Sequence, residues 1–145
     1  MGTLRERVSD PAKRKQVIEE ATRVIDAEVS EKSGLSGMAI KAAYAMAKGL
    51  APGMVAKMLD HLMNDFLDAL QPFQDEAQQK GVGLRSLLDG RRAEAANALL
   101  AITDQRAVGE SGPLKKGYEK LRPAAQKHVE QAIPRLSDLI TKIAA

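Results

Sequence analysis

The amino-acid sequence predicts an all-α protein, a single compact bundle of about five or six helices. The chain is rich in residues that favour helices, with 23 alanines and 16 leucines among its 145 residues. The alternation of apolar and polar residues that indicates a strand does not persist anywhere in it. Because a domain typically contains about 100–200 residues, we expect residues 1–145 to form one helical domain.

The first two predicted helices differ in how their apolar residues are distributed. Asp10 and Pro11 indicate the start of the first, since Asp caps helices and Pro suits the first helical position. Its apolar residues recur on one face, and it is expected to end near Gly34. The second, over residues 35–48, is Ala-rich and apolar almost all round. Since a helix of that kind is normally buried on every side, we predict that it is the central helix of the bundle.

Pro52 opens a third predicted helix, which has the widest apolar face in the chain. Nine residues line that face: Met54, Val55, Met58, Leu59, Leu62, Met63, Phe66, Leu67 and Leu70. We expect Pro72 to bend or end this helix, and the glycines at 81–83 to break it. A short turn at 84–88 and a further helix around Leu99 follow.

The last predicted helical region follows a loop at 109–113. Pro123 is expected to start its main helix, in which apolar residues four and three apart form a short heptad seam: Val129, Ile133, Leu136, Ile140 and Ile143. Pro134 lies inside this seam and predicts a kink. The seam either packs within the bundle or pairs two chains, and the spacing alone does not distinguish the two arrangements.

Several stretches, spread over nearly the whole chain, resemble a known family. They are Lys32–Gly37, Lys48–Gly53, Leu99–Asp104, Tyr118–Arg122 and Lys127–Glu130. Together they resemble a family of short all-helical bacterial proteins of unknown function. The resemblance implies an all-helical, stand-alone protein, and it implies no activity and no site residues.

The composition excludes several classes of function. The chain has no Cys, so it can form no disulfide, thiolate zinc site, iron–sulfur cluster or thiol nucleophile. No stretch is long and apolar enough for a membrane span, and residues 1–7 do not resemble a signal peptide, so we expect a cytoplasmic protein. The sequence contains no nucleophile elbow and no Ser–His–acid spacing. We therefore expect a protein that is not an enzyme and that binds no cofactor.

The polar edge of the third predicted helix is the one candidate metal site. His61 and Asp65 are four residues apart, share a face of the helix and could hold a metal together. Asp60, Asn64 and Asp68 lie near them. Two ligands do not make a site, and no second Glu-x-x-His element completes one, so the face is expected to be solvated instead.

The net charge of +3 is concentrated near the end of the chain. Residues 113–145 carry seven basic and three acidic groups, whereas the rest of the chain is almost balanced. The candidate nucleic-acid-binding residues are Lys115, Lys116, Lys120, Arg122 and Lys127. Interleaved acidic residues weaken this interpretation, as does the shortage of aromatic residues that could stack on bases. A solvated helix face is the alternative.

These observations favour a non-catalytic helical module that binds a partner protein or assembles with itself as a homodimer through an exposed helix face. The second hypothesis is a nucleic-acid-associated protein that uses the basic C-terminal segment. The third is a carrier of an apolar ligand, because Met54, Met58 and Met63 could form an adaptable interior.

Overall fold

The computed structural model describes residues 2–50, 53–109 and 112–144, and every regular element within them is an α-helix. The seven helices are α1 (Leu4–Arg7), α2 (Pro11–Glu31), α3 (Gly34–Leu50), α4 (Met54–Lys80), α5 (Leu84–Asp89), α6 (Arg92–Val108) and α7 (Pro113–Ala144). The prediction of an all-α bundle is therefore confirmed. The count exceeds the prediction because a single helical turn, α1, precedes the Asp10–Pro11 start signal.

Local capping explains where the first helices begin. The Asp10 side chain accepts a hydrogen bond from the Lys13 backbone N–H at 3.0 Å, and Pro11 is the first residue of α2. In α1, the Thr3 hydroxyl accepts from the Glu6 backbone N–H, and the Glu6 carboxylate accepts in return from the Thr3 backbone N–H. This reciprocal capping box stabilises a helix that is otherwise too short to form.

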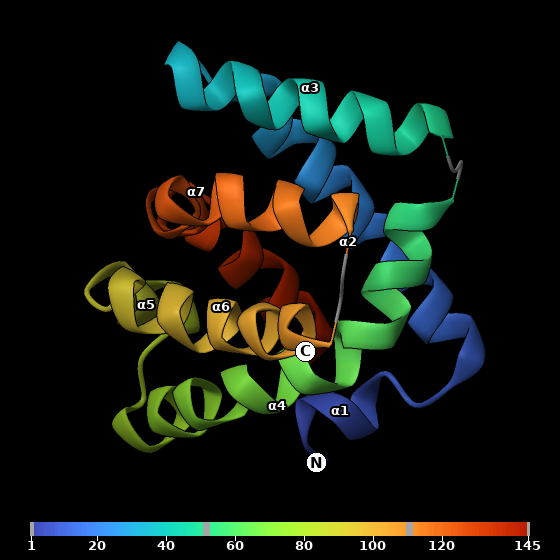
Figure 1. Cartoon of the computed structure of the whole chain (residues 1–145). Helices are drawn as coiled ribbons and strands as arrows, with labels where there is room; N and C mark the ends of the chain where they lie inside the picture. The colour runs from blue at the N-terminus through green and yellow to red at the C-terminus, as the bar shows by residue number, and fades with distance from the viewer. Residues whose placement is uncertain (1, 51–52, 110–111, 145) are drawn as a thin grey trace.

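The central helix is α7, and α3 lies at one edge of the molecule. Figure 1 shows α3 along the top, α7 below it, and α4, α5, α6 and α1 further down. Helix α7 packs against α1, α2, α3, α5 and α6. The prediction that the Ala-rich helix at 35–48 is central is therefore wrong.

The physical reason is that alanines bury little area. Among the α3 residues whose burial the structure describes, Gly37 alone is buried, and Ile40 and Tyr44 are half-buried, all on the side toward α2 and α7. The opposite side is open, since Leu35 is 90% exposed, Met38 66% and Met46 64%. Burial stabilises in proportion to the apolar area removed from water, so the Leu-, Ile- and Phe-bearing faces of the other helices occupy the interior.

The core is built from buried apolar residues of six helices and from Val8, the residue that follows α1. It comprises Leu4, Val8, Val17, Ala21, Met63, Leu67, Leu70, Phe73, Ala77, Leu84, Leu88, Ala95, Leu99, Ile133, Leu139, Ile140 and Ile143. Three of the five residues of the predicted heptad seam are in this list, and Val129 and Leu136 pack against them. The seam thus packs within the bundle, the first of the two arrangements left open by its spacing.

Prolines bend the two longest helices. Pro72 lies inside α4, and Pro123 and Pro134 lie inside α7. Figure 1 shows that both helices change direction along their length, as expected where a proline removes a backbone donor. Because α7 continues through Pro123, the prediction that a helix starts there is wrong. The predicted start at Pro52 and part of the predicted 109–113 loop lie outside the described residues.

Gly37 sets how closely α3 approaches the end of α2. A Cβ on Gly37 would lie 2.8 Å from the Lys32 carbonyl carbon and 3.1 Å from the Lys32 Cβ. We expect Gly37→Ala to lower the free energy of unfolding by about 1 kcal/mol, because overpacking costs about 1–3 kcal/mol and the better helix former returns up to about 1 kcal/mol. Urea denaturation measures the change. Gly117→Ala in α7 is the matched control: its Cβ meets no atom within 4 Å, so that substitution is expected to stabilise.

Candidate functional site

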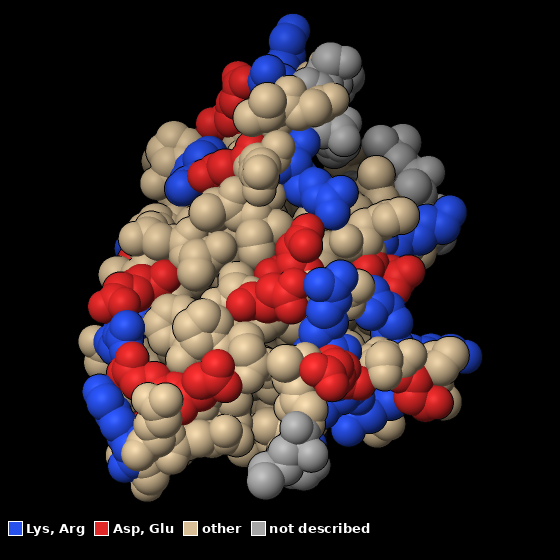
Figure 2. Space-filling view, turned by 90° about the horizontal axis from the view of Figure 1, so that it is seen from below, with Lys and Arg blue, Asp and Glu red and all other residues tan. Residues whose placement is uncertain are grey.

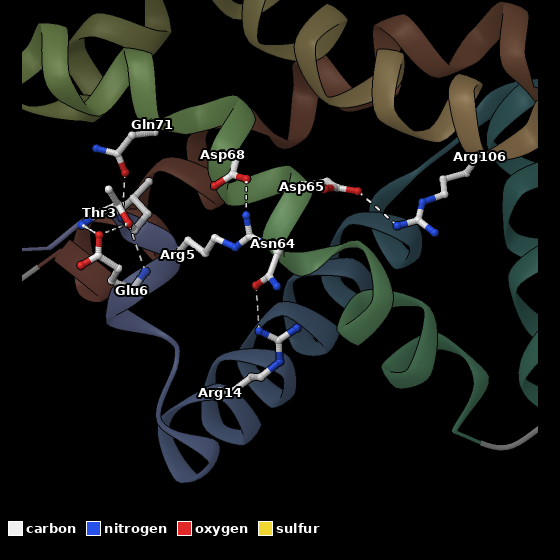
Figure 3. A network of polar contacts seen from close by, with 10 residues as sticks. Thr3, Arg5, Glu6, Arg14, Asn64, Asp65, Asp68, Gln71 and Arg106 are labelled. Carbon is white, nitrogen blue, oxygen red and sulfur yellow. Dashed lines mark hydrogen bonds and ion pairs between the residues drawn. The ribbon is translucent and has the colours of Figure 1, made fainter.

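Charges of both signs alternate on the surface over α1 and α4. Figure 2 shows this face from below, with Lys and Arg side chains beside Asp and Glu side chains across it. The close-up in Figure 3 shows that the mixture is ordered, since arginines from three helices reach the polar edge of α4. This edge contains the residues that the sequence singles out as candidate metal ligands.

Each carboxylate on the polar edge of α4 is paired with an arginine. Arg14 of α2 donates to Asp60 at 2.6 Å and to the Asn64 side chain at 3.0 Å. Asp68 accepts from Arg5 of α1 at 3.0 Å. Farther along the edge, the Leu4 backbone N–H donates to the Gln71 side chain at 2.6 Å (Figure 3). These contacts hold α1 and α2 against α4.

The candidate metal pair does not form a metal-binding cluster. Asp65 is bound by Arg106 of α6 at 3.2 Å, and the same guanidinium donates to the His61 carbonyl at 3.4 Å. Among the residues that the structure describes, no three His, Cys, Asp or Glu side chains come close enough to hold a metal ion. The polar edge therefore links helices, and its three paired aspartates remain about half exposed to solvent.

The five candidate nucleic-acid-binding residues separate into two groups. Arg122 lies in the interface with α6, where it makes two hydrogen bonds to Asp104, at 2.8 and 3.0 Å. The four lysines project from the first half of α7: Lys116, Lys120 and Lys127 are exposed, and Lys115 is half-buried. Within the described part of the chain these four lysines form no ion pair. The lysines of α7 are thus accessible to a ligand, Lys115 only in part. Arg122, by contrast, helps to hold α7 against α6.

Sequence analysis missed a repeated arrangement that joins consecutive long helices. A tyrosine and a cation four residues later, on one helix, both donate to an aspartate on the preceding helix. In α3, Tyr44 and Lys48 bind Asp26 of α2, with the lysine at 3.2 Å. In α7, Tyr118 and Arg122 bind Asp104 of α6 in the same way. The i, i+4 spacing of tyrosine and cation was visible in the sequence, but the aspartate that receives them was not.

The two aspartates are more acidic than usual because of these contacts. Hydrogen bonds from Arg122 and then Tyr118 lower the pKa of Asp104 from its ordinary value of 3.8. The hydrogen bond from Tyr44 is the main cause that lowers the pKa of Asp26. Burial, followed by the bond to the aspartate, raises the pKa of each tyrosine. Both tyrosines therefore remain neutral hydrogen-bond donors at physiological pH.

These shifts predict a loss of stability in acid. A carboxylate whose pKa is lowered in the folded state contributes stability that is present above its unfolded pKa and disappears as the pH falls through its folded pKa. We expect the wild type to lose stability below about pH 4 and Asp104→Asn to lose less over the same range. Urea denaturation between about pH 7 and pH 2.5 measures this difference. Equal losses in the two proteins would contradict the proposed role of Asp104.

Neither of two surface cavities found among the described residues is lined by methionine. One, of about 300 Å³, is a groove between α2 and α7 with Val24, Ala27 and Leu139 in it and charged residues of both signs around it. The other, of about 280 Å³, lies beside α1 and is mainly polar. Met63 is in the core, Met54 is half-buried and Met58 is exposed. The predicted methionine-rich interior for an apolar ligand is thus not what these cavities provide.

The largest run of exposed apolar side chains among the described residues lies on α3. We call it the α3 stripe and define it as Leu35, Met38, Ala39, Ala42, Ala45, Met46 and Gly49, all of which are exposed. The stripe carries no charge, and the two charged residues of the helix, Lys41 and Lys48, lie to one side of it. Exposed apolar side chains that gather on one face indicate an interaction surface, whereas isolated ones such as Val82 and Val108 are ordinary.

The fold and these surfaces define the class of protein as an all-helical bundle with one apolar helix exposed at its edge. No helix among the described residues is long and apolar enough to cross a membrane. The chain belongs to a family of unknown function (DUF6918), whose model matches residues 4–144. Comparisons with curated proteins and with solved structures find no match.

Proposed function

We propose that this protein is a non-catalytic cytoplasmic binding module whose α3 stripe packs against a helix of a partner. One observation carries the proposal: three large apolar side chains are exposed on one uncharged face of a single helix. Each square ångström of apolar surface removed from water contributes roughly 25 cal/mol, so covering them favours association. Small residues between them let another helix approach closely, which makes a helix the best occupant.

The other polar features support a binding role more than a catalytic one. The carboxylates of the α4 edge and the Asp26 and Asp104 carboxylates are bound by cations of the same chain. A carboxylate held in this way is a poor general base, because the bound cation lowers its proton affinity. The α3 stripe, by contrast, has nothing packed over it within the described part of the chain.

Site-specific photo-crosslinking in the cells that produce the protein tests the proposal. A photoreactive residue at Met38 or Ala45 is expected to form an adduct with one and the same protein, and the adduct is expected to disappear when Met46→Glu is added. The same photoreactive residue at Val108, which is 79% exposed on α6, is the matched control and should give no such adduct. Adducts that persist in Met46→Glu, or none at either stripe position, would overturn the proposal.

Binding of nucleic acid is the second candidate, and it is favoured by the four lysines of α7 that form no ion pair with a described residue. Lysines that neutralise phosphates make affinity fall steeply as salt rises. Titration of a short DNA or RNA duplex at several salt concentrations measures that slope. The triple variant Lys116→Gln, Lys120→Gln, Lys127→Gln is expected to abolish binding, and no binding by the wild type at low salt would exclude this candidate.

A further inference from the structure

The α3 stripe has the spacing of a helix-pairing seam. Leu35, Met38, Ala42, Ala45 and Gly49 are three, four, three and four residues apart, and all are exposed. This is the spacing at which one helix packs lengthwise against another. The heptad seam of α7 has the same spacing, but its residues are packed in the core of their own chain. The α3 stripe, by contrast, remains exposed.

The sizes of the side chains on the stripe identify the helix that fits it. Ala42 lies at the middle of the stripe, both along the helix and across it. Before Ala42 the stripe contains Leu35, Met38 and Ala39, and after it Ala45, Met46 and Gly49. If a second α3 lies antiparallel with its Ala42 against this one, Leu35 falls opposite Gly49, Met38 opposite Ala45, and Met46 opposite Ala39. Each large side chain then meets a small one, and beyond the adjacent residues and backbone of α3 a Cβ at Gly49 would meet no described atom within 4 Å.

From this pattern we infer that the partner of the α3 stripe is a second copy of this chain, paired antiparallel across a two-fold axis at Ala42. The inference rests on the proposed function. A two-fold interface requires one patch to be complementary to itself, with residue i against residue j and j against i, and the stripe meets that requirement. A parallel pair would set Leu35 against Leu35 and Gly49 against Gly49, which crowds one end and leaves a gap at the other.

The charges beside the stripe set the salt dependence of this pairing. Helix α3 carries Lys41 and Lys48 and no acidic residue, and Lys48 is already paired with Asp26. In the antiparallel pair the two Lys41 side chains lie on the same side, near the axis, and repel one another. Salt screens that repulsion, so the association is expected to strengthen as salt rises. An acidic protein, a nucleic acid or an anionic membrane bound to the same lysines would show the opposite dependence.

The area available predicts a weak dimer. A helix of 17 residues is about 25 Å long and roughly 10 Å wide, so lengthwise pairing covers several hundred Å² on each chain. A specific interface buries at least about 1,000 Å² in total, and this contact lies near that limit. We therefore expect an equilibrium between monomer and dimer that depends on protein concentration.

Sedimentation equilibrium of the purified chain from about 1 µM to about 1 mM measures that equilibrium. The dimer fraction is expected to grow with protein and with salt, and to be lost in Met38→Glu, which is accessible enough to leave the fold intact. Far-ultraviolet circular dichroism checks that the variant remains helical. A monomer at every concentration, or a dimer that survives Met38→Glu, would overturn the inference.

Single cysteines test the register, since the chain has no Cys of its own. A disulfide needs Cα atoms within about 7 Å, so Ala42→Cys is expected to form a disulfide dimer under mild oxidation. Ala43→Cys, which is also exposed but lies off the stripe, is the matched control and should not form one. The double variant Ala39→Cys, Met46→Cys should crosslink, whereas each single variant should not. Crosslinking of Ala43→Cys as fast as Ala42→Cys would overturn the antiparallel register.

The two proposals fail in distinguishable ways. If photo-crosslinking from Met38 captures a different protein while the purified chain stays monomeric, the second-copy inference is wrong and the binding module stands. If the monomeric chain instead binds phosphatidylglycerol vesicles through α3 and no protein adduct forms, both are wrong. An adduct of twice the chain mass, lost in Met46→Glu, supports both.

Discussion

Replacing Ile133 by Ala is expected to lower the free energy of unfolding by about 3–4 kcal/mol. Ile133 is 0% exposed in the middle of α7, the helix that packs against most of the others. Removing its outer carbons loses their transfer free energy and leaves a cavity that a close-packed interior fills only in part. Urea denaturation of the wild type and the variant measures the difference, provided that the free energy of unfolding falls with urea at the same slope in both proteins.

Two controls make the result specific to the core position. Val108→Ala removes a comparable side chain that is 79% exposed and is expected to change the stability by less than about 0.5 kcal/mol. The Ile133→Ala loss should also be the same at low and high protein concentration, because the seam packs within one chain. A loss that grows with protein concentration would show that the seam joins two chains instead.

The seam also illustrates what a sequence reveals about a helical bundle. The spacing of Ile133, Ile140 and Ile143 identified the apolar side of α7, and that side is buried. Such periodicity is local, because it depends only on residues a few positions apart in one helix. The Asp10–Pro11 start signal succeeded for the same reason, since its hydrogen bond to Lys13 spans three residues.

The position of a helix within the bundle is not local, and here prediction from the sequence failed. An Ala-rich helix can lie at the centre or at the edge, and the outcome depends on which helices offer more apolar area to the core. Helix α3 offers Ile40 and Tyr44 inward, whereas α4 offers Met63, Leu67, Leu70 and Phe73. Comparing helices in this way would have placed α3 at the edge and directed attention to its open face.

The sequence predicted that the polar residues of α4 share one face of the helix, but it did not predict which residues of other helices they contact. Asp68 and Asp65 pair with arginines that are 63 and 41 residues away in the sequence. Helical periodicity does not relate residues so far apart, so the sequence did not predict which arginines bind these carboxylates. Long-range pairing therefore places Arg106 on Asp65, a contact that the shared helix face of His61 and Asp65 does not predict.

Replacing Glu28 by Gln is expected to lower the free energy of unfolding by about 3 kcal/mol. Glu28 is 12% exposed and lies 3.1 Å from the ammonium of Lys32, which is itself 8% exposed. The side-chain oxygen of Gln131 at 3.1 Å and the His128 carbonyl at 3.4 Å are the other acceptors around that ammonium. Neither carries a charge, so the variant leaves a buried cation without a carboxylate, a change that costs about 3–5 kcal/mol in comparable pairs. Glu28 also forms an ion pair with Arg135, and that pairing of opposite charges is lost too.

A double-variant cycle separates the buried cation from the general loss of a contact. Lys32→Met removes the charge and keeps an apolar stem of similar length, so Glu28→Gln combined with Lys32→Met should recover most of the loss. Asp68→Asn, which breaks an exposed pair with Arg5, is the matched surface control and is expected to cost less than about 1 kcal/mol. If the double variant were as unstable as Glu28→Gln alone, the loss would come from Arg135 and not from Lys32. Such a result would place the strongest link between α2 and α7 on the surface of the bundle.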